Sequence, residues 1–187
     1  MKKIKIKVLK FEELKPEVQK KVIENNRYFN VEDSDWDKWI LEEETENLNK
    51  KGFENAVIHY SGFYSQGDGA CFTANVNIMK VLKHLKLLSK CKNICKKSIT
   101  IKIIKSSSMY HHENTMDIDY FDYEDIKILK EYELISEQIL QYAKNKAIKI
   151  YNNLEKSYCD LISDEQIKES LIINEYDFLE DGTRWIK

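Results

Sequence analysis

Residues that alternate between apolar and polar, or that are β-branched and aromatic, predict the strands of this chain. A short strand is predicted at Lys3–Leu9, and four longer consecutive strands are predicted at 56–64, 71–78, 98–105 and 109–120. A short connection rich in glycine or serine separates the first from the second of these four strands, and the third from the fourth. Such connections are typical of hairpins, so the four strands are predicted to be antiparallel.

Apolar side chains spaced three or four residues apart predict the helices. They are expected at 11–25, 36–48, 77–89, 124–160 and 164–174. Pro16 is tolerated in the first turn of the first helix, where a backbone amide has no partner inside the helix. Gly52 is a C-terminal stop for the second helix, and Ser163 resembles the N-cap of the last one.

The helix predicted at 124–160 contains neither glycine nor proline. Its apolar stripe, spaced by four and three residues, consists of Ile128, Tyr132, Ile135, Ile139 and Tyr142. With a rise of about 1.5 Å per residue it reaches roughly 55 Å, whereas a nine-residue strand reaches about 30 Å. We therefore expect the helix either to kink near Asn152 and Asn153 or to extend past the sheet. If the helix extends past the sheet, a second copy of the chain would cover the stripe and form a homodimer. If it does not, the stripe is ordinary core.

These elements predict an α+β fold: an antiparallel sheet of about four to five strands, built from two hairpins and covered by helices that include the long C-terminal helix. A chain of 187 residues with 42% hydrophobic residues is expected to form a single domain. Its parts are the N-terminal strand and helices at 1–51, two hairpins joined by a helix at 52–122, and the long helix and tail at 123–187.

The beginning of the chain, MKKIKIKV, alternates lysine with β-branched residues and lacks the apolar core of a signal peptide. No apolar run approaches the roughly 18 residues that span a bilayer. We therefore expect a cytoplasmic protein that has no membrane partner.

The net charge of −2 conceals segregated blocks of charge. Residues 79–105 carry nine lysines and no acidic residue, whereas residues 113–137 carry nine acidic residues and residues 160–181 carry eight. Lysine outnumbers arginine 28 to 2, and arginine dominates bidentate recognition of phosphates and bases. Specific nucleic-acid binding by the 79–105 lysines is therefore an alternative that we do not expect.

The cysteines give no sign of a metal site. Cys91 and Cys95 are the only close pair, and no further Cys or His pair completes a ligand set with recognisable spacing. Cys71 lies within an alternating strand, which favours a small core residue over a nucleophile activated by His59 or His111. No metal and no cofactor are predicted.

Three of the five glycines fall within eight residues, in the segment YSGFYSQGDGACF at Tyr60–Phe72. A chain this poor in glycine uses it where backbone geometry leaves little choice, so Gly67 and Gly69 are expected at positive φ in a hairpin loop. A rigid loop also presents its exposed polar groups to a partner at a low ordering cost. The candidate binding residues are Tyr64, Ser65, Gln66, Gly67, Asp68 and Gly69, with His111 and Glu113 from the second hairpin.

The second hairpin contains the strongest catalytic candidates of the chain. On a strand, His111 and Glu113 share one face, and His112 lies on the other. If both hairpins present their loops at one end of the sheet, His111 and Glu113 converge with Ser65 and Asp68, as an acid–base hydrolase requires. A polar strand face without catalysis is the simpler interpretation, so we lean against an enzyme.

Three segments resemble a family of small phage and prophage proteins. The segment Tyr60–Phe72 is similar to that family's signature, Met109–Met116 to its Tyr-His-Glu stretch, and Leu161–Gly182 to its closing segment. Many members are labelled hypothetical, or antitoxin of a toxin–antitoxin stability system. The similarity covers roughly residues 52–184, and the lysine-rich N-terminal strand and helices depart from it.

The resemblance and the acidic blocks favour a non-enzymatic protein that binds and blocks a host or toxin protein, in the manner of an antitoxin or an anti-defence protein such as an anti-CRISPR. A nucleic-acid-processing effector suits an acidic surface, because its channel is basic. The first alternative is a small hydrolase that acts on a nucleotide-like ligand between Ser65–Gly69 and His111–Glu113. Nucleic-acid binding by the 79–105 lysines is the second alternative.

Overall fold

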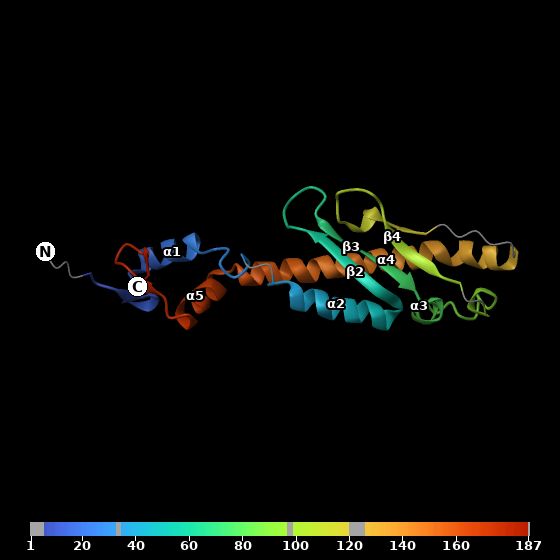
Figure 1. The fold of residues 1–187 in the computed structure, drawn as a ribbon, viewed down its shortest axis with the longest axis horizontal. Coiled ribbons are helices and arrows are strands. Elements are labelled where there is room, and N and C mark those ends of the chain that lie inside the picture. The colour runs from blue at the N-terminus through green and yellow to red at the C-terminus, as the bar shows by residue number, and fades with distance from the viewer. Residues whose placement is uncertain (1–5, 33–34, 97–98, 120–125, 187) are drawn as a thin grey trace. The chain divides into compact units, whose positions relative to one another are not determined.

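The computed structural model describes residues 6–32, 35–96, 99–119 and 126–186 of the chain (Figure 1). The α-helices are α1 (Pro16–Asn25), α2 (Lys38–Lys51), α3 (Ile78–Leu85), α4 (Ile126–Leu161) and α5 (Asp164–Ile173). The strands are β1 (Leu9–Lys10), β2 (Phe53–Ser61), β3 (Gly69–Val76), β4 (Ile101–Lys105), β5 (Met116–Ile118), β6 (Asp177–Phe178) and β7 (Arg184–Trp185). Three short 3-10 helices are η1 (Phe11–Glu13), η2 (Ile94–Lys96) and η3 (Glu113–Thr115).

The chain divides into two compact units. Unit 1 combines Met1–Lys38 with Lys156–Lys187, and unit 2 is Trp39–Glu155. Unit 1 contains a sheet with the strand order β1-β6-β7, and unit 2 contains a sheet with the order β2-β3-β4-β5; every pairing is antiparallel. The predicted α+β fold is therefore confirmed, with its four-stranded sheet in unit 2. The expectation of a single domain stays a prediction.

The register of the four-stranded sheet decides which side chains share a face. Phe53 pairs with Val76 and Ala74 pairs with Ile103, whereas His59 pairs with Cys71. Because side chains alternate along a strand, the even-numbered residues of β3 point to one face and Cys71 points to the other. Ala70, Phe72, Ala74 and Val76 are all buried, which marks the even-numbered face as the core.

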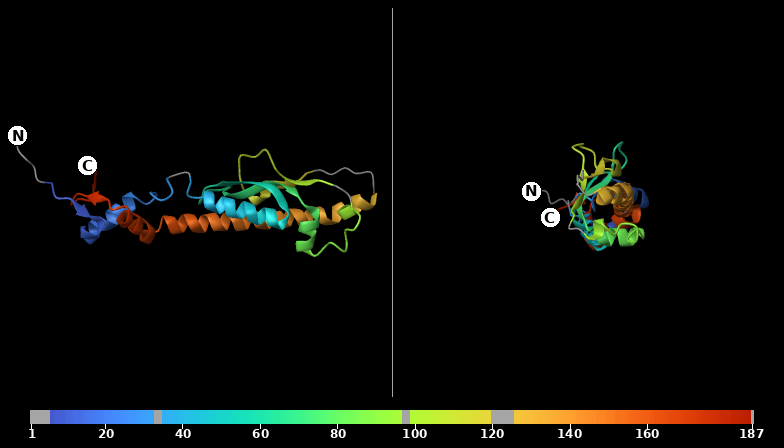
Figure 2. Two further views of the ribbon diagram at one scale, coloured as in Figure 1. Left: turned by 60° about the horizontal axis from the view of Figure 1, so that its bottom comes forward. Right: turned by 90° about the vertical axis from the view of Figure 1, so that its right-hand side faces the viewer.

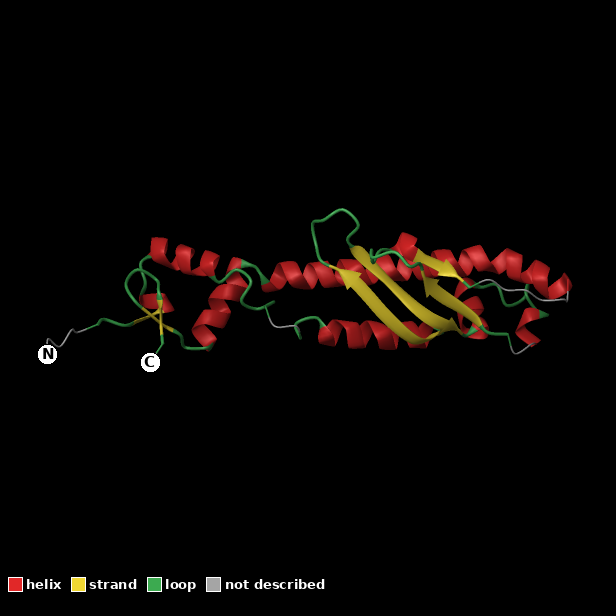
Figure 3. Cartoon of the chain, turned by 45° about the horizontal axis from the view of Figure 1, so that its top comes forward, coloured by secondary structure: helices red, strands yellow, loops and turns green. Residues whose placement is uncertain are grey.

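Helix α4 packs against this core face, and Figures 2 and 3 show it running along the sheet. The ring of Tyr142 on α4 lies 5.7 Å from that of Phe53, which in turn contacts Phe72 edge-on at 5.2 Å. Ile135 and Ile139 of the predicted stripe are fully buried. The stripe is thus core of its own chain.

No break interrupts the helical assignment of α4 at Asn152 or Asn153. We expected either a kink near these residues or a helix that extends past the sheet. Helix α4 continues through both asparagines as one helix. The predicted homodimer through this helix stays a prediction.

The fourth predicted strand, at 109–120, is wrong for most of its length, because only Met116–Ile118 form β5. Residues just before β5 satisfy their backbone groups locally: the amide of Thr115 donates to the carbonyl of His112 at 2.9 Å, and the amide of Asn114 donates to His112 Nδ1 at 3.2 Å. These bonds form η3 in place of a ladder. Residue 120 lies outside the described residues.

The other elements are shifted at their ends. The N-terminal strand is the two-residue β1, of which only Leu9 lies in the predicted Lys3–Leu9; residues 3–5 lie outside the described part. Helix α3 begins after Asn77, whose side chain accepts from the amide of Lys80, and ends at Leu85 because Lys86 is left-handed. Gly52 follows α2 at a φ of +99°, as a C-terminal stop requires.

Unit 1 has its own core, in which the two ends of the chain meet. Leu9 of β1 pairs with Phe178 of β6, and the rings of Phe11 and Phe178 contact each other edge-on. The buried residues of this core are Phe11, Leu14, Val22, Ile23, Ile167, Leu171 and Phe178. The pairing of β6 with β1 and β7 was not anticipated from the sequence.

Truncation of Ile139 tests the packing of α4. We expect Ile139→Ala to lower the free energy of unfolding by about 2–5 kcal/mol, because it leaves a cavity in a close-packed core. The matched control is Ile148→Ala on the same helix, whose side chain is 41% exposed. It is expected to cost less than about 1 kcal/mol. Urea unfolding followed by circular dichroism measures both, and equal losses would contradict the assigned core face.

Candidate functional site

Two connections of the four-stranded sheet lie side by side, and we call them the paired loops. They are residues 62–68 between β2 and β3, and residues 106–115 between β4 and β5 (Figure 1). A Cβ atom built on Gly67 would lie 2.6 Å from Cδ1 of Tyr110, and one built on Gly69 would lie 2.6 Å from Cβ of His112. The two segments therefore contact each other at glycine backbone.

The two glycines serve different purposes. Gly67 has a φ of +90°, as predicted for the hairpin turn. Gly69 is not in the positive-φ region, so that part of the expectation is wrong. Its Cβ would also lie 2.8 Å from Cα of His112, which is backbone and cannot move aside easily. Gly69 is needed for space, at the first residue of β3.

Asp68 holds the turn of the first loop. Its Oδ2 accepts from the amide of Ser65 at 2.6 Å, and its own amide donates to the carbonyl of Ser65 at 3.2 Å. Ser65 and Gln66 are exposed at the tip. The structure thus places the predicted polar residues on the surface of a turn that two hydrogen bonds between Ser65 and Asp68 close.

Tyr64 occupies an unusual backbone conformation in this loop. Its φ is +86°, and its side chain is 74% exposed. Non-glycine residues at positive φ carry a strain of about 1–3 kcal/mol, and such strain gathers at functional sites. An aromatic side chain is therefore held on the surface at an energetic cost.

The second loop places His111 over the sheet face that α4 does not cover. The imidazole rings of His111 and His59 stack, with centroids 5.6 Å apart and planes inclined by 17°. Within the described residues, Nδ1 of His111 and Oγ of Ser61 are buried and have no hydrogen-bond partner. Burial lowers the pKa of His111, and the positive charge of Lys105 and the neighbouring His59 lower it further. The neutral imidazole is favoured.

Cys71 lies under the same cluster, paired across the strands with His59. Its side chain is fully buried, and burial raises the pKa of its thiol more strongly than the hydrogen bond with Thr115 lowers it. A thiol in this environment is held in its protonated, unreactive form. This agrees with a packing role for Cys71.

His111 and Glu113 do not share a strand face, because neither residue lies in a strand. Glu113 begins η3, and its Oε1 accepts from Nδ2 of Asn114 at 2.9 Å. The carboxylate of Asp68 accepts from the amide of Ser65 in its own turn. The pKa of Tyr151 on α4 is raised first by burial, then by the charge of Glu155 and least by that of Asp68. These three candidate groups thus have different partners, and the contacts that the structure records between the loops do not join them into an acid–base pair.

The positions of the cysteine, histidine and acidic side chains decide whether a metal ion could be held. Among the residues that the structure describes, no group of three or more His, Cys, Asp or Glu side chains is arranged to hold a metal ion. Burial raises the pKa of Cys91 and of Cys95, and the carboxylate of Glu131 raises both further. Both thiols therefore resist the deprotonation that metal binding needs.

Sequence reasoning missed the aromatic and thioether part of the site. Met109 is 82% exposed and Tyr110 is 51% exposed, in a segment that the alternation of residues assigned to a strand. A signal was available in the three serines at 106–108, which break the strand pattern just before these residues.

Comparison with known proteins identifies the domain that carries this site. Residues 36–164 match the model of the family described as "Domain of unknown function (DUF8835)". The chain belongs to this family. The match includes all of unit 2, so the paired loops lie within the DUF8835 domain. No curated protein and no solved structure matches the chain. Among the described residues, no helix has the length and apolar character that a membrane crossing requires.

Gly69→Ala tests the contact between the paired loops. We expect a loss of about 1–3 kcal/mol in the free energy of unfolding, because the new methyl group overlaps the backbone of His112. The control is Gly62→Ala in the same loop, where a Cβ would meet no atom within 4 Å. Thermal unfolding of both variants measures the difference. If Gly69→Ala is as stable as Gly62→Ala, the two loops are not in contact.

The lowered pKa of His111 predicts a dependence of stability on pH. Its pKa in the folded chain lies below the ordinary value of 6.5, so below that pH the unfolded chain binds more protons. The free energy of unfolding is therefore expected to be highest above about pH 6.5 and to fall as the pH decreases toward the lowered pKa. Urea unfolding between about pH 7.5 and 5.5 should show a shallower decrease for His111→Asn. His84→Asn, at an exposed histidine of α3, should keep the wild-type decrease; equal slopes in all three proteins would refute the role of His111.

Proposed function

We propose that the protein is a non-enzymatic inhibitor whose paired loops bind and block another protein. The observation that carries this proposal is the exposure of Tyr64, Met109 and Tyr110 on two loops that hold each other in place. Large apolar side chains on a constrained surface are the usual anchors of a protein interface.

The physical cost of binding supports the same function. Ordering a flexible loop at an interface costs about 0.5–1.5 kcal/mol for each immobilised side chain. Here the turn at Asp68 and the contact of Gly67 with Tyr110 already order both loops in the unbound protein. Tyrosine adds a large contact area with few rotatable bonds, and methionine adapts its shape to the partner.

The charge around the paired loops favours a partner with a basic surface. Glu113 and Asp117 follow Met109 and Tyr110 in the chain, and Asp117 is exposed. The ammonium group of Lys105 donates to the carbonyls of Ser106 and Ser108 and keeps its positive charge, but Asp68, Glu113 and Asp117 outnumber it. A basic partner such as a nucleic-acid-processing host effector or toxin complements this surface. The resemblance to phage proteins labelled as antitoxins points to the same class.

The hydrolase alternative is supported less well. A general base must reach the proton that it removes, and Nδ1 of His111 is a buried atom without a hydrogen-bond partner among the described residues. Asp68 is the second acidic or basic group that such an enzyme would use, and its carboxylate accepts from the amide of Ser65.

Binding to a purified partner tests the proposal. A tagged form of the chain is used to isolate its partner from the natural host, and the affinity of the purified pair is then measured by calorimetry. Tyr64→Ala and Met109→Ala are each expected to weaken binding by about tenfold or more, as the loss of an interface anchor does. Their melting temperatures should remain unchanged, because both side chains are exposed.

The matched control is Met79→Ala on α3, which removes another exposed methionine of unit 2. It should bind the partner with wild-type affinity. Wild-type affinity in the Tyr64→Ala/Met109→Ala protein would rule out the paired loops as the interface. Turnover of a nucleotide substrate that is lost in His111→Asn would instead establish the hydrolase.

A further inference from the structure

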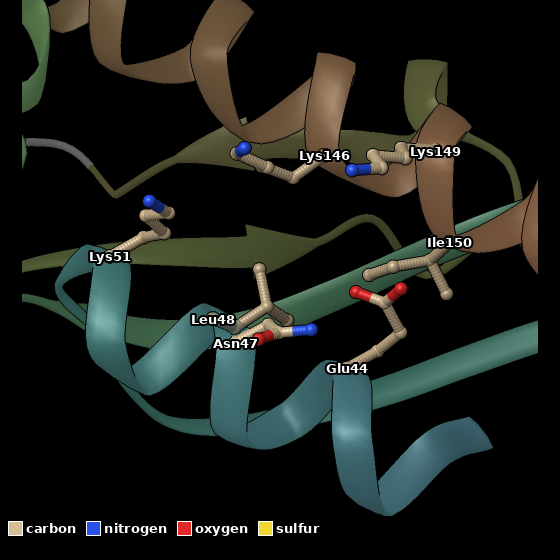
Figure 4. A pocket seen from close by; sticks show the side chains of 7 residues that line it. All are labelled: Glu44, Asn47, Leu48, Lys51, Lys146, Lys149 and Ile150. Carbon is tan, nitrogen blue, oxygen red and sulfur yellow. The ribbon is translucent and has the colours of Figure 1, made fainter.

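Helices α2 and α4 enclose a cavity within unit 2, away from the paired loops (Figure 4). Its volume is about 170 Å³. The residues that line it are Glu44, Asn47, Leu48, Lys51, Lys146, Lys149 and Ile150. Leu48 is buried against the sheet and Ile150 is buried on α4, so the cavity has an apolar base.

Three lysines from two helices surround this space. Figure 4 shows Lys51 on α2 facing Lys146 on α4 across the gap, with Lys149 one turn further along. Lys51 and Lys146 are half-buried, and Lys149 is exposed. All three therefore line one cavity, and the exposure of Lys149 places part of that cavity at the protein surface.

The positive charge of the cavity is only partly balanced. Glu44 is the single acidic residue of the lining, and its Oε1 accepts from Nδ2 of Asn153 at 2.6 Å. None of the ion pairs within the described residues involves Lys51, Lys146 or Lys149. Three ammonium groups against one carboxylate leave two positive charges in excess.

The charges at this site act on one another. The pKa of Lys146 is lowered, first by burial and then by the positive charges of Lys51 and Lys149, while Glu44 acts in the opposite direction. The ammonium of Lys146 lies 5.0 Å from the centre of the Tyr142 ring, which offers partial compensation from its negative face. An anion in the cavity would remove this repulsion.

Structural roles do not account for all three lysines. Lys51 ends α2, where a cation is favoured by the helix dipole. Lys146 and Lys149 lie in the interior of α4, where the dipole gives no such benefit and where two like charges one turn apart repel each other. Helix stability alone therefore does not explain the two lysines of α4.

We propose that the cavity between α2 and α4 binds a phosphate group, either as free phosphate or as the phosphate monoester of a nucleotide or a nucleic-acid end. A phosphate monoester carries close to two negative charges above its second pKa of about 6, which matches the excess of two positive charges. Lysine is a suitable ligand, because its ammonium is a compact charge with three donors. The side-chain amide of Asn47 adds a neutral donor on the α2 side.

The size of the cavity limits what enters it. Pockets that enclose a whole drug-sized ligand have volumes of about 300–1,000 Å³, well above that of this cavity. A phosphate group fits, with any attached sugar or base outside the mouth. Glu44 is then available to accept a hydrogen bond from a sugar hydroxyl group.

Titration of the whole chain with defined anions tests the proposal. The probes are inorganic phosphate, adenosine 5′-monophosphate, and one short oligonucleotide with and without a 5′-phosphate, all at constant ionic strength. Binding is followed by calorimetry and by the amide NMR signals of Asn47 and Lys146. Saturable binding of at least one phosphate-bearing probe at one site is expected, with signal changes confined to α2 and α4.

A pair of matched variants separates a specific site from general surface charge. Lys51→Gln/Lys146→Gln removes one cavity lysine from each helix, and Lys50→Gln/Lys130→Gln removes one lysine outside the cavity from each. The first protein is expected to bind about tenfold or more weakly, because charge-assisted hydrogen bonds are lost. The second should bind within about twofold of wild type. Lys130 lies about four turns away along α4, and the exposed ammonium of Lys50 pairs with Glu46 outside the cavity, so solvent and salt screen both charges.

Glu44→Gln is expected to strengthen binding, which a loss of folded structure would not do. It removes the one negative charge of the cavity, so inorganic phosphate is expected to bind several-fold more tightly. The proposal is overturned if none of the probes saturates below about 10 mM, which is weaker than specific binding requires. It is also overturned if both double variants weaken binding equally, or if the oligonucleotide binds equally well without its 5′-phosphate and no other probe binds.

Discussion

The contact between α4 and one face of the four-stranded sheet is the interaction on which unit 2 depends. On the core face of β3, small and large side chains alternate. They are Ala70, Phe72, Ala74 and Val76, and all are buried. Ala143 and Ala147 of α4 are also fully buried. Small residues let the backbones approach closely, while each large buried side chain contributes about 1.5–3 kcal/mol to the hydrophobic stabilisation. Helix α4 thus covers one face of the sheet, and His111 of the second loop stacks on His59 at the other face.

The sequence pattern predicted those parts of the fold that have a repeating period. Strands β2 and β3 and helix α4 show clear periods of two and about three and a half residues, and each was predicted with shifts of a few residues at its ends. The segment before β5 was predicted wrongly, because His112 caps a local turn that competes with strand pairing. Strands of two residues, such as β6, have no period at all. Their existence depends on partners that are distant in the sequence.

The same distinction applies to the candidate site. The concentration of glycine located the first loop, and it correctly suggested positive φ at Gly67. It could not reveal that Gly69 is required by the approach of His112, since that contact is made by tertiary folding. The lysines of the α2–α4 cavity were equally hidden: Lys51 is separated from Lys146 by most of unit 2 and meets it only after folding.

The pairing of β1 with β6 joins two stretches of chain that are made at different times. Unit 1 is built from two stretches of chain, and the whole of unit 2 lies between them in the sequence. On the ribosome, Leu9 is made before unit 2 and its partner Phe178 is made after it. Unit 2 is therefore synthesised completely while the first stretch of unit 1 still lacks half of its core. The loop that this pairing closes contains all of unit 2, and the entropy lost on closing it is smaller once unit 2 has folded.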